Sequence, residues 1–251
     1  MKYFLILSAL CISLLCKGES NFTGLMDQAN QHYSKGEYQQ AIAFYNQILS
    51  QGKESAETYF NLGNSYFKLK DFNNALLNYE RASLLSPNDE DIRFNIRIAN
   101  QYVVDNPEAL PKPFFSRWLE SLINLYPTDK WANFSLATFI IFLLILGSFF
   151  FIRSIRIKRT SFWFGILFIL ISICCFSFAS KQKARLVKRD HAIVFCPRVT
   201  VKSSPSKSGT DLFLIHEGLK VQVTDSLGNW KEIRLIDGNQ GWLPDSCIVR
   251  I

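Results

Sequence analysis

The sequence has few of the residues that catalysis and metal binding use most often. Only three of its 251 residues are histidines, and His32, His191 and His216 lie in different parts of the chain. There is no glycine-rich phosphate loop, no His-Glu-x-x-His, no Cys-x-x-Cys and no Gly-x-Ser-x-Gly. A catalytic base needs a partner within hydrogen-bonding reach, and the sequence indicates none. We therefore expect no catalytic residues, no metal site, no cofactor and no enzymatic activity.

Charge is absent from two long stretches, residues 131–152 and 160–180, which are 22 and 21 residues long. Residues 153–159 between them carry four positive charges. About 20 apolar residues in a helix cross a bilayer, and a helix satisfies its own backbone polar groups there. Two buried core helices are the alternative, but core helices are seldom uncharged for so long. The pattern predicts two transmembrane helices joined by a basic loop.

The net charge of +7 is concentrated beside these two stretches. Residues 153–159 contribute +4 and the five bases of residues 181–189 contribute +5, so the rest of the chain is slightly acidic. Basic residues next to membrane spans normally anchor lipid headgroups and set the orientation. The lipid bilayer is therefore an expected partner, and nucleic acid is not.

Residues 1–20 have the pattern of a secretory signal peptide. Lys2 is followed by 13 apolar residues at 3–15, which is short for a membrane span but typical of a signal core. Small residues at Gly18 and Ser20 offer cleavage positions. Lipidation at Cys16 and retention as an uncleaved anchor are the alternatives, although Leu15 is large for the position before a lipidated cysteine.

An internal repeat of 34 residues covers residues 22–55 and 56–89. Small residues recur where helices must approach closely, and Pro87 stops the last helix. The unit closely resembles a tetratricopeptide repeat. This resemblance implies two antiparallel helix pairs, and a capping helix with acids in its first turn completes residues 22–105. About three units are expected for stability, so self-association or membrane contact is expected to complete the array. The matching residues of the second copy are Tyr59, Leu62, Gly63, Tyr66, Phe72, Ala75, Tyr79 and Ala82.

The resemblance places the first helix of each repeat on a concave, peptide-binding face. Asparagines on such a face hydrogen-bond an extended peptide, and Asn30 and Asn61 match the clamp with which some family members hold a C-terminal carboxylate. Met26 and Asp91 stand where that clamp has cations, which argues against carboxylate capture. A polar face that merely stays solvated is the alternative. The expected peptide-binding residues are Met26, Asn30, Tyr33, Asn61, Asn64, Phe67 and Lys68.

Residues 106–130 connect the repeats to the first apolar stretch. Their first part is proline-rich and therefore extended and stiff. The second part places apolar residues at helical spacing, which favours an amphipathic helix at the lipid interface. Packing beneath the repeats is the alternative. The residues of the apolar face are Phe115, Trp118, Leu119, Leu122 and Tyr126.

The pattern changes to a period of two in residues 190–251, where six short strands alternate with turns. The order of these segments and the Gly241-Trp242-Leu-Pro244 ending resemble a bacterial SH3 domain. That resemblance implies a small all-β barrel that binds a ligand. We expect Trp230, Trp242 and Pro244 at its binding surface, with burial of either tryptophan in the core as the alternative. The expected strands are His191–Phe195, Val199–Lys202, Leu212–Ile215, Leu219–Val223, Trp230–Leu235 and Cys247–Ile251.

Two cysteines, Cys196 and Cys247, lie at the end of the first expected strand and the start of the last. The terminal strands of SH3-like barrels lie close together, so these cysteines are able to form a disulfide if the domain is exported. Two buried free thiols are the favoured alternative. Cys174 and Cys175 lie in the second apolar stretch and are expected to pack as small apolar residues.

The orientation follows from the signal peptide and the number of spans. A cleaved signal followed by two spans leaves both soluble modules outside the inner membrane, and residues 153–159 become a cytoplasmic loop that obeys the positive-inside rule. The five bases of residues 181–189 disagree with that rule. We expect both modules to be periplasmic because the signal and the even number of spans outweigh this flank.

The whole arrangement resembles the tetratricopeptide and SH3 member of the Bat (aerotolerance operon) family of bacterial membrane proteins. Segments 87–100 and 213–218 carry the resemblance in detail. It implies a membrane accessory protein that acts with von Willebrand A-type Bat proteins and is linked to tolerance of oxidative stress.

Two functions are compatible with these features. The first is a non-enzymatic inner-membrane scaffold that holds one protein partner with its repeats and a second peptide with its SH3-like domain. The alternative is a cell-envelope sensor whose SH3-like domain binds peptidoglycan. The expected fold class is multi-domain, with an all-α tetratricopeptide array, a two-helix transmembrane hairpin and a small all-β SH3-like barrel.

Overall fold

The computed structural model describes residues 23–111, 113–152 and 154–251. The expected signal peptide at residues 1–20, with Cys11 and Cys16, lies outside the described residues. The chain divides into two compact units. The first contains the chain up to Ser83 together with Glu90–Ala109 and His191–Ile251, and the second contains Leu84–Asp89 and Leu110–Asp190.

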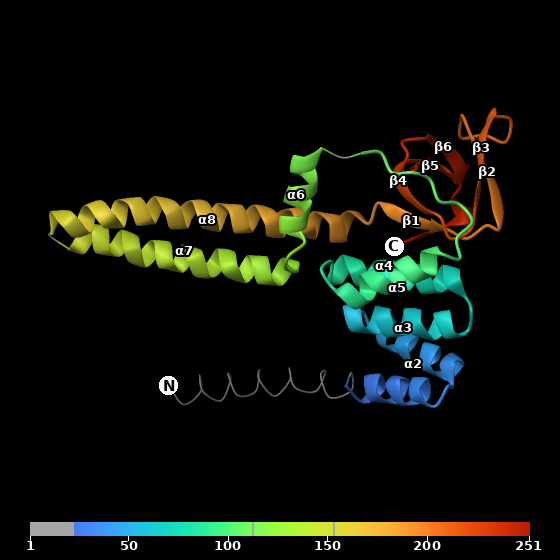
Figure 1. Cartoon of the computed structure of the whole chain (residues 1–251), viewed down its shortest axis with the longest axis horizontal. Coiled ribbons are helices and arrows are strands. Elements are labelled where there is room, and N and C mark those ends of the chain that lie inside the picture. The colour runs from blue at the N-terminus through green and yellow to red at the C-terminus, as the bar shows by residue number, and fades with distance from the viewer. Residues whose placement is uncertain (1–22, 112, 153) are drawn as a thin grey trace. The chain divides into compact units, whose positions relative to one another are not determined.

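Helices follow one another from residue 23 to residue 100 and form a stack in the first unit (Figure 1). Local signals set their limits: Ser55 Oγ accepts a hydrogen bond from Thr58 N at 3.0 Å to cap one helix, and Gly36 takes a positive φ of 78° in one turn. The helices are residues 23–34, α2 (Tyr38–Ser50), α3 (Ala56–Lys68), α4 (Phe72–Leu85) and α5 (Glu90–Asn100).

Gly63 is the point of closest approach between α3 and α4. A Cβ atom there would lie 2.7 Å from two ring carbons of Tyr79, which is itself 1% exposed. The repeat period places Arg97 of α5 at the position that follows Gly63 by 34 residues. Arginine leaves no room for a tyrosine to pack as Tyr79 does. This favours α5 as the terminal helix of the array, in agreement with the expected cap.

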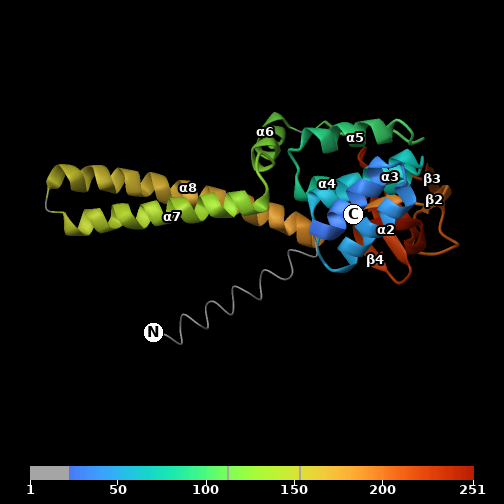
Figure 2. The same ribbon diagram turned by 90° about the horizontal axis from the view of Figure 1, so that it is seen from below.

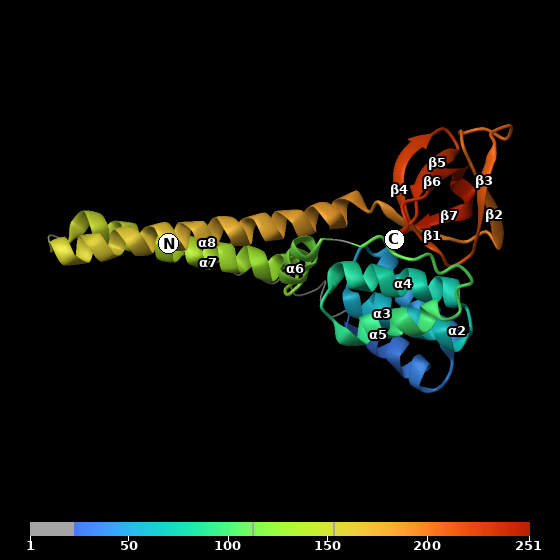
Figure 3. The same cartoon turned by 45° about the horizontal axis from the view of Figure 1, so that its top comes forward.

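The C-terminal part of the first unit is an antiparallel sheet of seven strands in the order β3-β2-β6-β5-β4-β1-β7 (Figure 3). The sequence predicted six of them and missed β6, which carries the Gly-Trp-Leu-Pro ending. The strands are β1 (His191–Val194), β2 (Arg198–Lys202), β3 (Asp211–His216), β4 (Lys220–Leu227), β5 (Trp230–Arg234), β6 (Gln240–Pro244) and β7 (Ile248–Arg250), with a 3₁₀ turn η1 (Asp245–Cys247) before the last.

The sheet surrounds one apolar core that includes the fully buried Val201, Ile233 and Leu243. Core residues alternate with exposed or half-buried residues along β2 and β6, as expected for strands with one buried face. In the described residues, β3 and β7 stand at opposite ends of the strand order and do not pair with each other. The structure thus shows an antiparallel sheet, and closure into the expected barrel is not seen.

The array and the sheet also contact each other within the first unit. Lys220 Nζ lies 2.5 Å from Glu80 Oε2, and Asn73 Nδ2 donates to Glu217 Oε2 at 2.8 Å. Gly218 has a positive φ of 86°, and a Cβ atom there would lie 2.8 Å from Val103 Cγ2. Helix α4 and the turn between β3 and β4 therefore meet through mainly polar contacts.

The second unit contains α6 (Phe114–Ile123), α7 (Thr128–Phe151) and α8 (Ile155–Lys188). Helices α7 and α8 run side by side in all three views (Figures 1–3). Both are long and apolar enough to cross a membrane, and only 6% and 22% of their most apolar stretches are buried. A core helix of a soluble protein would be mostly buried, so this exposure fits insertion into a membrane.

Helix α8 is longer than the sequence predicted at both ends. The expected loop at 153–159 is mostly helical, because α8 begins at Ile155 and contains Arg156, Lys158 and Arg159. The helix also continues past residue 180 to Lys188 and ends at Arg189, which has a left-handed φ of 40°. Lysine, arginine, glutamine and alanine favour helix strongly, so loss of hydrophobicity ends the span without ending the helix.

Serine pairs join α7 and α8 at two levels. Ser135 Oγ donates to the carbonyl oxygen of Ser172 at 3.0 Å, and Ser172 Oγ donates to that of Ser135 at 3.0 Å. Nearer the other end, the hydroxyls of Ser148 and Ser161 lie 2.8 Å apart. Small residues that also hydrogen-bond are typical of helix contacts in lipid, where hydrophobic attraction between helices is absent.

Candidate functional site

Asn30 joins the two repeats through its side-chain oxygen. Tyr45 Oη donates a hydrogen bond to Asn30 Oδ1 at 2.6 Å, and Asn61 Nδ2 donates to the same oxygen at 3.2 Å. The hydroxyl comes from α2 and the amide from α3, so one asparagine connects three helices. We call these three residues the first asparagine cluster.

A second asparagine cluster repeats this arrangement. Tyr79 Oη donates to Asn64 Oδ1 at 2.8 Å, and Asn95 Nδ2 donates to the same oxygen at 3.1 Å. Adding 34 to each residue number of the first cluster gives the second. The sequence prediction missed Asn95 because it treated α5 only as a cap, although the 34-residue distance from Asn61 was available. Helix α5 therefore supplies a site residue.

The two tyrosines keep their protons and hold these asparagines in one orientation. Burial, followed by the neighbouring Tyr33 and Glu57, raises the pKa of Tyr45 to about 12. Burial also raises the pKa of Tyr79. Because each asparagine oxygen accepts two hydrogen bonds, the Nδ2 groups of Asn30 and Asn64 are the donors that remain, and no other described residue accepts from them. Such donors can pair with a peptide carbonyl.

The other expected peptide-binding residues have different surroundings. Met26 is 6% exposed and packs in the core with Ala29 and Tyr45, so its prediction as a surface residue was wrong. Tyr33 is half-buried, with its ring centroid 5.4 Å from that of Tyr38. Lys68 is exposed at the end of α3.

Phe67 belongs to an aromatic group at the other end of α3. Its ring centroid lies 5.4 Å from Phe72 and 5.9 Å from Tyr102, and the last two rings stack at 3.8 Å. Phe67 is half-buried, so the chain following α5 covers part of it. The asparagines and Lys68 remain the accessible polar residues of the expected set.

The sheet brings the three expected SH3-surface residues together. Trp230 of β5 is directly opposite Pro244 of β6. Trp242 lies on the same face as Pro244, because Gly241 and Leu243 between them point to the core. Each of the three is half-buried. A surface made of two tryptophans and a proline offers flat apolar contact to a ligand.

Charged residues flank this aromatic surface on both sides of Trp242. Lys202 and Glu232 are its partners in the neighbouring strands. Lys202 Nζ is held 2.6 Å from Asp211 Oδ1, and Glu232 Oε2 accepts from Thr224 Oγ1 at 2.7 Å. The surface thus carries both signs of charge.

Cys196 and Cys247 are joined by a disulfide. The backbone already brings them together, because Phe195 N donates to the carbonyl oxygen of Cys247 at 2.8 Å. The sequence left a disulfide and two free thiols open, and the structure has the disulfide. In the second apolar helix, Cys174 is exposed and Cys175 is buried, and both are free thiols.

A buried glutamine fixes α6 to the end of α8. Gln182 is 6% exposed, and its Nε2 donates to the carbonyl oxygens of Ile123 at 2.5 Å and Tyr126 at 2.9 Å. Trp131 Nε1 donates to the Ile123 oxygen as well, at 2.9 Å. These bonds satisfy carbonyl groups at the end of α6.

The N-terminal half of α6 leaves large apolar side chains exposed. Phe115 is 69% exposed and Trp118 is 50% exposed, while Leu119 and Leu122 are half-buried. This distribution agrees with the amphipathic pattern of the sequence. The exposed side chains suit contact with lipid at an interface.

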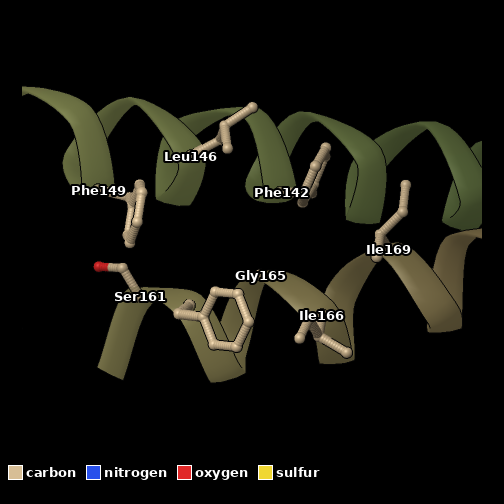
Figure 4. A pocket seen from close by; sticks show the side chains of 8 residues that line it. Phe142, Leu146, Phe149, Ser161, Gly165, Ile166 and Ile169 are labelled. Atoms are coloured by element: carbon tan, nitrogen blue, oxygen red, sulfur yellow. The ribbon is translucent and has the colours of Figure 1, made fainter. Parts of the chain in front are cut away.

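An apolar recess of about 270 Å³ lies between α7 and α8 (Figure 4). Phe142, Leu146 and Phe149 line it from α7, and Gly165 and Ile166 line it from α8. Its one hydroxyl, on Ser161, is already paired with Ser148. The recess has no group for chemistry. In the described part of the chain, no cluster of three or more His, Cys, Asp or Glu side chains is placed to hold a metal.

Comparison with known families identifies the repeats. Two family models match: one described as tetratricopeptide repeat covers residues 56–89, and one described as TPR repeat covers residues 29–70. No curated protein matches the chain. The matched residues include both tyrosines and three of the four asparagines of the clusters. The chain is therefore a protein that contains tetratricopeptide repeats.

Proposed function

We propose that the protein is a non-enzymatic membrane scaffold whose repeats hold a protein partner. The observation that carries this proposal is the pair of asparagine clusters. Each cluster fixes an asparagine whose amide donor is directed away from its protein acceptors. Two such donors, one repeat apart, suit the regularly spaced carbonyls of an extended peptide. Tetratricopeptide repeats bind proteins generally, which agrees with this role.

The proposal places α7 and α8 in the inner membrane and both modules of the first unit in the periplasm. The disulfide between Cys196 and Cys247 supports this orientation, because disulfides persist in oxidising compartments. The bases near the start of α8 then face the cytoplasm, as the positive-inside rule requires. The signal peptide at residues 1–20 belongs to the same proposal.

The sheet is proposed to be an SH3-like domain that presents Trp230, Trp242 and Pro244 to a second ligand. By its resemblance to the Bat family, the protein would assist von Willebrand A-type membrane proteins in tolerance of oxidative stress. Self-association remains part of the proposal, because an array of two repeats and one further helix is short.

Co-purification from a detergent extract tests the role of the repeats. Replacing Asn30 and Asn64 by alanine should remove membrane proteins that co-purify with the tagged full chain and are identified by mass spectrometry. Asn106→Ala is the matched control, since Asn106 is exposed outside the array. Circular dichroism must show that the double variant keeps its helices. Unchanged co-purification with the folded double variant would contradict the proposal.

A second candidate function is a cell-envelope sensor that binds peptidoglycan through its sheet. The aromatic surface favours it, because tryptophan faces stack on the apolar faces of sugars. Trp242→Ala should then abolish retention of the full chain on purified sacculi, whereas Asn64→Ala should leave it unchanged. If the wild-type chain is not retained, the sensor hypothesis fails and the scaffold proposal is unaffected.

A further inference from the structure

The surface that carries the asparagine clusters also carries a set of acids. We call it the A-helix face, and it consists of the sides of helix 23–34, α3 and α5 that share the clusters. Asp27 lies three residues before Asn30, and Glu57 lies four residues before Asn61. Residues three or four apart are neighbours on a helix surface. Asp27 and Glu57 are both exposed.

The third helix continues the series. Asp91 lies four residues before Asn95, and it follows Glu57 by 34 residues. Lys68 is the base on this face, one turn beyond Asn64. Arg93 and Arg97 of α5 lie two residues away from the Asp91 and Asn95 positions, which places them on the opposite side of the helix. The A-helix face therefore has three acids and one base.

An independent effect locates the charge of Glu57 beside the first cluster. The carboxylate of Glu57 contributes to the raised pKa of Tyr45, after burial and Tyr33. This requires the acid to lie close to the hydroxyl that fixes Asn30. A ligand that meets the asparagine amides also meets this negative charge.

The acids oppose the type of ligand that a carboxylate clamp holds. A free C-terminal carboxylate needs cations beside the asparagines, and the face has Glu57 and Asp91 near them, while Met26 is in the core. An internal segment has no terminal charge, and lysines or arginines within it would be attracted. Phe94, which is 53% exposed one turn from Asp91, adds an apolar contact.

We propose that the A-helix face binds an extended, basic, internal segment of a partner protein and does not bind a C-terminal carboxylate. This inference rests on the proposed scaffold function and specifies its ligand. The Nδ2 groups of Asn30 and Asn64 pair with backbone carbonyls of the segment. Asp27, Glu57 and Asp91 pair with its basic side chains, and Phe94 contacts an apolar residue between them.

Fluorescence anisotropy with three peptide pools tests the inference on the full chain in detergent micelles. Each pool is a fluorescein-labelled, degenerate 11-residue peptide with alternating apolar positions. The basic pool has fixed lysines and blocked ends, and the acidic pool has glutamates in their place. The third pool has serines there and a free C-terminal carboxylate. We expect the basic pool to bind about tenfold more tightly than the other two in low salt, and to lose this preference in high salt.

Single substitutions assign the preference to the face. Glu57→Gln should weaken binding of the basic pool about two- to fivefold, as expected for an exposed charge pair, while Lys68→Glu should strengthen it. Glu108→Gln is the matched control, because Glu108 is exposed in the linker. Asn64→Ala should weaken binding of the basic pool without removing its dependence on salt.

The outcomes separate the inference from the scaffold function. Tighter binding of the acidic or carboxylate pool would overturn the inference, as would unchanged affinity in both Glu57→Gln and Lys68→Glu. If no pool binds while membrane proteins still co-purify through Asn30 and Asn64, the inference is wrong and the scaffold function stands. If co-purification also fails, both are wrong.

Discussion

Gly63 shows how much of the repeat depends on the absence of one side chain. Its hydrogen occupies the space in which a Cβ atom would lie 2.7 Å from the ring of Tyr79 and 3.2 Å from the carbonyl oxygen of Ala75. The same tyrosine donates to Asn64. A shift of the ring would therefore disturb the second asparagine cluster as well as the packing.

The first prediction concerns this glycine. Gly63→Ala should lower the free energy of unfolding of the array by about 1–3 kcal/mol, because overpacking outweighs the better helix propensity of alanine. Gly24→Ala is the control, since nothing lies within 4 Å of a Cβ atom there. It should be neutral or stabilising. Urea unfolding followed by circular dichroism measures both, and equal stabilities would contradict the packing argument.

The second prediction concerns pH. Tyr45 has a pKa of about 12 in the folded array against 10.0 for an ordinary tyrosine. Between these values the folded state keeps a proton that the unfolded state has lost, so stability is full below pH 10 and falls as the pH rises toward 12. Tyr45→Phe should flatten this part of the stability curve. Denaturant unfolding between pH 9 and 12 measures it, and a curve that stays flat for the wild type would contradict the burial of the hydroxyl.

At the scale of elements, α6 and α8 show how a helix end can be held from outside. The carbonyl oxygens of Ile123 and Tyr126 receive their hydrogen bonds from Gln182, and Arg185 Nη1 donates to Asn124 Oδ1 at 3.2 Å. The residues after position 180 thus have a structural role. This gives a physical reason for part of the basic segment that the positive-inside rule alone does not explain.

The third prediction tests this attachment. Gln182→Ala leaves two buried carbonyl groups without their donor, which should cost about 1–3 kcal/mol. The amides of α6 should then exchange hydrogen faster, as measured by mass spectrometry on the chain in micelles. Lys183→Ala provides the control, because Lys183 is exposed on the neighbouring position of α8. Equal exchange rates in the two variants would show that α6 is held by other contacts.

At the scale of the whole molecule, the proposed function depends on which side of the membrane each module occupies. Two candidate spans return the chain to its starting side, and the disulfide in the sheet suits an oxidising compartment. The fourth prediction follows. Cysteines introduced at Lys35 and Lys207, both exposed, should react with a membrane-impermeant maleimide in cells whose outer membrane alone is permeabilised.

The control for this labelling is a cysteine at Lys158, which lies near the start of α8 and should react only after the inner membrane is opened. Labelling of Lys158→Cys before lysis, with the other two positions protected, would reverse the proposed orientation. Labelling of only one module would show that the hairpin does not cross twice.

The sequence by itself determined the features that repeat or that depend on composition. A 34-residue period, two uncharged stretches and strand-like alternation are local signals, so the helices of the array, the two apolar helices and six strands were predictable. Prediction was poorer where a helix loses hydrophobicity without a breaking residue, as at Arg156 and Lys183 of α8, and at β6, whose motif was read as a signature alone.

Only the tertiary structure decided which side chains meet. The pairing of Asn64 with Asn95, the burial of Met26, the register that sets Trp230 opposite Pro244 and the approach of Cys196 to Cys247 all join residues from different elements. Such contacts depend on the angle and distance at which elements pack, and a periodic pattern does not contain that information. The 34-residue period fixed where each asparagine stands on its helix, and packing fixed which oxygen receives its amide.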